Sequence, residues 1–213
     1  MKSKMYIALT IFCILTLTIG AYAEDNRSEI YTNYTYNTLD LTTTIIGVEV
    51  NGYKEEIKAG TGFNAGYIYW INDWFGMGAG YDHLQSFGSE QTDNYKAIEL
   101  DGLYAQTSLR YNELLSFNLA VPYYNSIGED VTPGETTIIK GKGPGLLINA
   151  KLNYPLYDNL SLEGFAGYRL AALPIKERIK NFGHEDQVTE FKENSYSMNF
   201  SGYSVGIGLN FNY

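Results

Sequence analysis

The chain has 213 residues and a formal net charge of −9, and it contains 20 Tyr, 22 Gly and a single Cys. This length allows one domain or at most two small ones. The apolar and aromatic content excludes a disordered chain, and the acidic balance argues against a nucleic-acid partner. Many Tyr and Gly residues together favour short aromatic strands over helices.

Residues 1–23 are predicted to be a secretory signal peptide. Lys2 and Lys4 precede an apolar stretch, and Ala21-Tyr22-Ala23 has the small-x-small form of a cleavage site. An uncleaved anchor helix is the alternative, although the apolar core is short for one. Cleavage after Ala23 would remove the only cysteine, so we expect an exported protein without a disulfide.

The remaining chain, residues 24–213, is predicted to be a single domain. It contains no apolar run near the roughly 18 residues that a spanning helix needs. If this domain enters a membrane, it must therefore do so as a closed barrel, in which every backbone polar group has a partner.

Apolar and polar residues alternate with a period of two along most of the domain, which predicts strands. At the C-terminus, for example, Val205, Ile207 and Leu209 alternate with glycine, serine and asparagine. Seven predicted strands show this pattern, at 62–71, 75–84, 102–111, 115–124, 146–154, 160–172 and 201–213.

Short and long connections alternate strictly between these strands, as in outer-membrane barrels with short periplasmic turns and long outside loops. The short connections are 72–74, 112–114 and 155–159, and the long polar ones are 86–97, 127–142 and 174–197. Barrels of this kind have an even number of strands, so an eighth is expected upstream. Our choice is 29–38, followed by a first outside loop at 39–59. The rival is 41–50, with Asn51-Gly52 as a tight hairpin turn.

The two faces of the strands differ in charge. The apolar face is nearly uncharged and suits lipid, whereas the other face is rich in Gly, Ser and Asn. The predicted fold is therefore all-β, an eight-stranded antiparallel transmembrane β-barrel, and a soluble two-sheet sandwich is the alternative. The polar face also carries a predicted interior charge network, made of Asp82, Arg110, Lys151, Glu163 and Arg169.

This network predicts how the interior is filled. If the last short hairpin is symmetric about Tyr157, Lys151 faces Glu163 directly across two strands. An eight-stranded barrel is just wide enough for its side chains to fill, and Trp70, Tyr104 and Phe165 are expected to point inward. We therefore expect a plugged polar interior, with a gated pore as the alternative.

These segments resemble the small outer-membrane β-barrel superfamily that includes the OmpA transmembrane domain, OmpX and OmpW. The resemblance rests on residues 60–82, GTGFNAGYIYWINDWFGMGAGYD, and 200–213, FSGYSVGIGLNFNY. It implies an outer-membrane location and contact with outer-membrane lipid. The last strand is similar to the signal that barrel-assembly machinery reads, with a terminal aromatic and apolar residues at every second position before it. The matching residues are Val205, Ile207, Leu209, Phe211 and Tyr213.

The expected role is structural or interactive, with the outside loops meeting an extracellular partner that the sequence does not identify. A narrow pore for ions or small solutes is the alternative, and a lipid-modifying enzyme is the third hypothesis. Catalysis has little support, because the adjacent Asp82 and His83 face opposite sides of a strand. No cofactor is expected. With two histidines and no cysteine in the exported chain, no metal site is expected either.

Overall fold

The computed structural model describes residues 28–39, 43–45, 48–50, 59–87, 95–132, 134–182, 185–190 and 196–212. The predicted signal peptide, Asn51-Gly52, His184 and Tyr213 lie outside the described residues. In the described ranges, no helix is long and apolar enough to cross a membrane.

The described part of the chain folds into strands joined in one antiparallel sheet. Their bounds are β1 Ser28–Thr38, β2 Thr43–Ile45, β3 Val48–Val50, β4 Ala59–Trp70, β5 Phe75–Phe87, β6 Tyr95–Arg110, β7 Leu115–Thr132, β8 Glu135–Pro144, β9 Leu146–Tyr157, β10 Leu160–Leu170, β11 Ala172–Phe182, β12 Glu185–Glu190, β13 Tyr196–Asn199 and β14 Gly202–Asn212.

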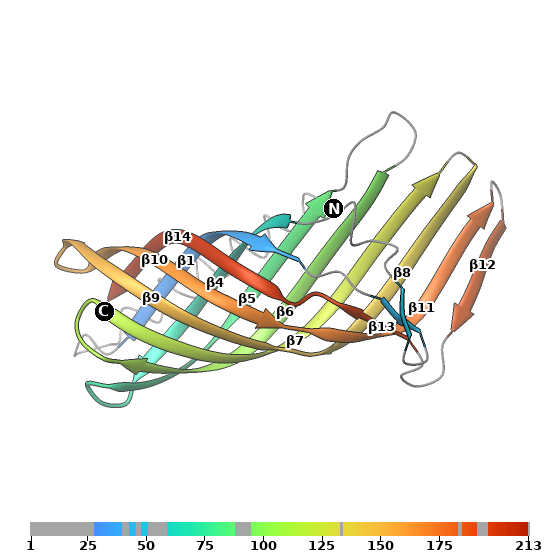
Figure 1. Ribbon diagram of the computed structural model, residues 1–213. Helices are drawn as coiled ribbons and strands as arrows, with labels where there is room; N and C mark the ends of the chain where they lie inside the picture. Colours follow the sequence, from blue (N-terminus) through green and yellow to red (C-terminus); the bar gives the residue numbers. More distant parts are fainter. Residues whose placement is uncertain are drawn as a thin grey trace.

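Eight of these strands close into a barrel in the order β1-β4-β5-β6-β7-β9-β10-β14, because β14 pairs with β1 and β7 pairs with β9. Figure 1 shows the tilted strands of this barrel, with short turns gathered at one end and long hairpins at the other. Closure removes free sheet edges from the barrel wall. The predicted eight-stranded antiparallel barrel is confirmed.

The first barrel strand is β1, which pairs along its length with both β14 and β4. This confirms the choice of 29–38 over 41–50. The rival segment instead contains the short strands β2 and β3, which pair with each other, and β2 also pairs with β13.

The sheet continues beyond the barrel where long polar loops were predicted. Strands β7 and β8 extend almost to Gly134, whose φ of 82° suits the tight turn there. Strands β11, β12 and β13 occupy much of 174–197. The connections at 127–142 and 174–197 are therefore long and polar, as predicted, but they are built largely of strands. In Figure 1 these strands project past the barrel as a ribbon-like extension of the sheet.

The extension has ion pairs between neighbouring strands. Lys140 Nζ lies 2.9 Å from Glu177 Oε2, and Lys180 Nζ lies 2.8 Å from Glu135 Oε1. The hydrogen bond from Lys180 lowers the pKa of Glu135. Cross-strand pairs of opposite charge support sheet pairing in water, which explains why so polar a segment forms strands.

Aromatic side chains fill the barrel where glycines leave room on the neighbouring strand. A Cβ added to Gly80 would overlap the Tyr104 ring, and one added to Gly206 would overlap the Phe165 ring. Trp70, Tyr104 and Phe165 are all buried, as predicted. These glycines are therefore needed for close approach of an aromatic ring rather than for backbone flexibility.

The outer face of the barrel is apolar and exposed. Leu103, for instance, is 72% exposed on β6, and the residues paired with it on the adjacent strands are the aromatic Tyr81 and Tyr123. Aromatic residues border this band at both ends, with Tyr36, Tyr123 and Tyr203 towards the long hairpins and Tyr69, Trp74 and Tyr111 beside the short turns. An apolar band between two aromatic girdles is typical of contact with a bilayer.

Candidate functional site

The middle of the barrel interior contains a buried ion pair. Lys151 Nζ lies 2.9 Å from Glu163 Oε1, and both side chains are almost completely buried. Glu163 also accepts hydrogen bonds from Asn33 and Asn210, at 2.6 and 3.3 Å. On its other side Lys151 lies 3.3 Å from the centre of the Tyr31 ring. Each charge therefore has a counter-charge and further polar or π partners, as burial in a closed interior requires.

The strand register around this pair differs from the prediction. Lys151 is opposite Phe165, and Glu163 is opposite Asn153, so the two charged residues are diagonal rather than direct neighbours. A bulge between Leu160 and Ser161 shifts the pairing, and β9 runs on to Tyr157, which leaves a tight turn in place of the predicted 155–159 connection. The predicted direct pairing is therefore wrong, although long side chains still bring the charges together.

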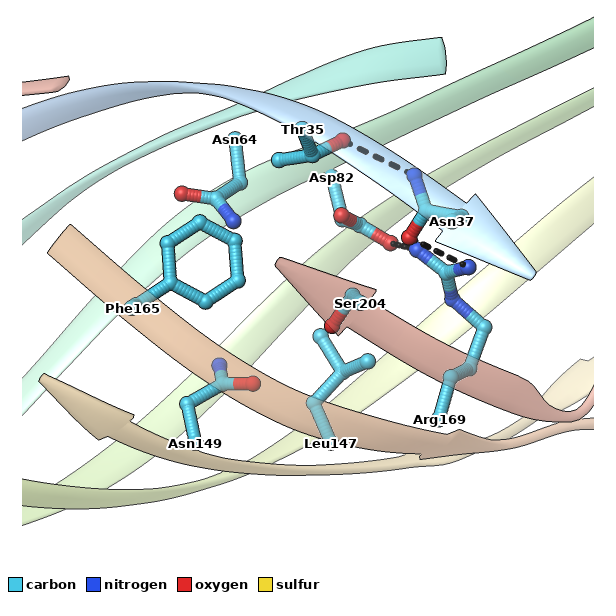
Figure 2. A pocket seen from close by; sticks show the side chains of 9 residues that line it. All are labelled: Thr35, Asn37, Asn64, Asp82, Leu147, Asn149, Phe165, Arg169 and Ser204. Carbon is cyan, nitrogen blue, oxygen red and sulfur yellow. Dashed lines mark hydrogen bonds and ion pairs between the residues drawn. The ribbon is translucent and has the colours of Figure 1, made fainter. Parts of the chain in front are cut away.

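A second cluster lies nearer the long hairpins. Arg169 donates a hydrogen bond of 2.8 Å to Asp82 Oδ2, and Tyr124 donates one of 2.7 Å to the same oxygen. Arg169 also bonds the Tyr124 hydroxyl and Asn37. Figure 2 shows Arg169, Asp82 and Asn37 meeting beside a cavity of about 10 Å³. That volume holds about one water molecule and no larger solute.

Replacing Tyr124 with phenylalanine removes one hydroxyl from this cluster and leaves the ring in place. We expect the free energy of unfolding to fall by about 1–3 kcal/mol, because Asp82 and Arg169 each lose a hydrogen bond in a buried site. Urea unfolding of the refolded protein in lipid vesicles measures the change. Tyr123→Phe is the matched control, since Tyr123 is exposed on the outer face, and it should leave stability nearly unchanged. Equal losses in both variants would contradict the role given to the cluster.

Near the short turns, Arg110 belongs to a third cluster. Its guanidinium lies 3.7 Å from Glu29 Oε2 and 3.9 Å from the centre of the Trp70 ring. Trp70 donates a 2.6 Å hydrogen bond to the same carboxylate oxygen. Glu29 is not among the interior charges that were predicted from the sequence. The alternation of side chains along β1 could have predicted its inward position, because Glu29 and Asn33 lie on the same face of the strand.

An apolar plug fills the interior beyond the Asp82–Arg169 cluster. Four of its side chains, from β5, β6, β11 and the link between β13 and β14, are completely buried: Leu84, Leu100, Leu173 and Phe200. The interior was predicted to be polar and plugged, with inward aromatic side chains, and this aliphatic layer was not among the predicted residues. Side chains that exclude water across the barrel oppose the passage of ions, because an ion crossing them would lose its hydration.

Four residues of the predicted assembly signal, together with His83, lie on the outer wall. Val205, Ile207, Leu209 and Phe211 alternate along β14 and are each between 41% and 57% exposed. His83 is on the outer face of β5, whereas Asp82 points inward, as strand alternation requires. Ser86 is buried and hydrogen-bonds the backbone of Ala59. The structure therefore places His83 on the opposite face of β5 from both Asp82 and Ser86.

A closed antiparallel barrel with an apolar outer band, aromatic girdles and a charged interior defines an integral membrane β-barrel of the outer-membrane type. The family model described as "Outer membrane protein beta-barrel domain" matches residues 9–213. The chain belongs to this family, and its location is the outer membrane. In proteins of this class the short turns face the periplasm, so the sheet extension faces outward.

Solved structures of the same fold are similar to this chain. Ail of Yersinia pestis is 14% identical with a TM-score of 0.56, covering 86% of this chain and 97% of its own. OprG of Pseudomonas aeruginosa is 11% identical with a TM-score of 0.55, covering 87% and 95%. The outer membrane protease OmpT of Escherichia coli is 9% identical with a TM-score of 0.52, covering 87% and 97%. These identities show a shared fold alone. A comparison with curated proteins finds no match.

Proposed function

We propose that this protein is a closed outer-membrane barrel whose role is structural or interactive rather than transport. The observation that carries the proposal is the filled interior. Three charged clusters occupy its inner and middle levels, and the apolar plug around Leu84, Leu100 and Phe200 occupies its outer level. Between them the cavity beside Arg169 holds about one water molecule.

The part of the protein available to an extracellular partner is the sheet extension. It combines ion-paired strands with exposed aliphatic side chains such as Val188, which is 55% exposed on β12. A rigid sheet presents such groups in a fixed arrangement, which reduces the entropy lost on binding. The proposal includes an assembly role for the outward residues of β14, recognised by barrel-assembly machinery before the barrel closes.

Bilayer conductance tests the closed interior. The refolded protein, inserted into a planar bilayer, should give no single-channel steps, because ions would have to cross the apolar plug. Insertion is established separately, by the heat-dependent electrophoretic migration of a folded barrel, and an open porin in the same bilayer is the positive control. Steady steps that change when Lys151→Met or Glu163→Gln is introduced would show a conducting interior and refute the proposal.

A narrow pore is the second candidate, and one wall of the interior favours it. Ser108, Asn118 and Asn149 lie in one row across β6, β7 and β9. The Ser108 hydroxyl, the nitrogen and oxygen of the Asn118 side-chain amide and the Asn149 side-chain oxygen are buried without a protein hydrogen-bond partner. Buried polar atoms of this kind are normally bonded by water, so this wall is expected to be hydrated. The conductance experiment separates a hydrated dead end from a through-pore.

We also propose that the protein has no enzymatic activity. Among the described residues, the hydrogen bonds of His83 include none to a serine, threonine or cysteine that could act as nucleophile. Activated hydroxyl nucleophiles normally lie within hydrogen-bond reach of their base. Assays for release of fatty acid from outer-membrane lipid and for cleavage of peptides test this, and activity lost in His83→Asn would contradict it.

A further inference from the structure

The outer wall of the barrel contains a group of potential metal ligands on two neighbouring strands. His83 on β5 is directly opposite Asp101 on β6, and Glu99 lies on the same face two residues before Asp101. One ligand atom from each of the three side chains lies within 4.8 Å of the others. The register of two consecutive long strands therefore brings an imidazole on β5 next to two carboxylates on β6.

The contacts around this group hold it in place. His83 Nδ1 lies 2.7 Å from Asp101 Oδ1, and the Tyr81 hydroxyl donates a hydrogen bond to the same carboxylate oxygen. The Phe63 ring packs against the imidazole at a centroid separation of 5.2 Å. The side chains of His83 and Asp101 are 13% and 35% exposed, so the group is partly enclosed but open on one side.

Negative charge exceeds positive charge at this position. In the part of the chain that the structure describes, neither Glu99 nor Asp101 forms an ion pair with a lysine or arginine. A single imidazole thus faces two carboxylates. Like charges held this close repel one another, and a bound cation would relieve that repulsion.

We propose that His83, Glu99 and Asp101 form a divalent transition-metal site, with Zn²⁺ as the preferred class of ion. One imidazole nitrogen and two carboxylate oxygens are ligands that Zn²⁺ accepts, and water completes the four-coordinate shell. Ligand atoms around such an ion are about 3.3 Å apart, so the three side chains need only small rotations. Binding displaces the proton between His83 and Asp101, because the ligands must be deprotonated.

The position of the group gives the site a physical role. It lies just outside Tyr81, which is level with Leu103 in the apolar band, and therefore at the depth of the lipid headgroups. A metal ion here would link β5 to β6. It would also neutralise the negatively charged carboxylates on the outer surface of the barrel, which otherwise face the negatively charged phosphates of the lipids.

Calorimetric titration of Zn²⁺ into the refolded chain in a zwitterionic detergent tests the proposal. We expect one ion per chain, with binding weakened more than 10-fold by His83→Asn and by Glu99→Gln, since each removes one of three protein ligands. Titration with Co²⁺ adds a spectroscopic readout, because a four-coordinate site gives an intense visible absorption band. Heat-dependent migration establishes that each variant is folded.

His184→Asn is the matched control, because His184 is the other histidine of the chain. It should leave the affinity unchanged. Glu99→Gln is the decisive variant, since it leaves the His83–Asp101 pair intact. Wild-type affinity in Glu99→Gln, loss of binding in His184→Asn alone, or no binding of Zn²⁺ to the unmodified chain would each overturn the proposal and leave an ordinary histidine–aspartate ion pair.

Discussion

Replacing Lys151 with methionine should lower the free energy of unfolding by about 3–5 kcal/mol, which is the usual cost of removing one partner from a buried ion pair. The reason is that the substitution leaves the carboxylate of Glu163 buried without a counter-charge. Its side chain is completely buried, and without Lys151 its charge has only the amides of Asn33 and Asn210 as partners. Urea unfolding in lipid vesicles, followed by tryptophan fluorescence, gives the difference directly.

Two further variants separate the ion pair from the loss of a lysine. The double variant Lys151→Met, Glu163→Gln should regain much of the lost stability, because no charge is then left unpaired. Lys140→Met breaks the partly exposed pair with Glu177 and should cost only about 0–1 kcal/mol. If Lys151→Met costs no more than Lys140→Met, the interior pair does not stabilise the barrel.

The barrel itself could be predicted from the sequence because one physical rule acts along every strand. Lipid on one face and a filled interior on the other impose strict alternation, which is visible in segments such as 201–213. The strand ends beyond the membrane follow a different rule. At 127–142 and 174–197, side chains meet water on both faces, so alternation disappears, and ion pairs such as Lys180–Glu135 depend on partners distant in sequence.

The sequence predicts which interior side chains the site contains only because side chains alternate between the two faces of each strand. Alternation along the strands predicted an inward position for five charged residues, namely Asp82, Arg110, Lys151, Glu163 and Arg169. Which of these charges form ion pairs depends on the register between strands. A bulge beside Leu160 shifts one hairpin, and the closing pair β1–β14 brings Glu29 and Asn210 to a common cluster. The apolar plug depends on register as well, because Leu84, Leu173 and Phe200 come from separate strand ends and show no shared motif.

Introducing arginine at Leu119 should destabilise the protein by about 2–4 kcal/mol, because this residue lies midway between the two aromatic girdles on β7. Its side chain is 46% exposed on the outer wall, where the surroundings are lipid. A guanidinium at that depth must either lose its hydration or reach water by thinning the bilayer around it. Both processes cost free energy.

The matched control is the same substitution at Leu114, which is 51% exposed in the turn before β7. The two leucines have nearly the same exposed fraction but differ in depth, since Leu114 lies in the turn before β7 and Leu119 in the middle of the spanning strand. Leu114→Arg should cost about 0–1 kcal/mol, as charged residues do near the interface. Urea unfolding in vesicles compares the two. On a barrel surrounded by water, both variants would be close to neutral, so a large difference between them can only come from lipid around Leu119.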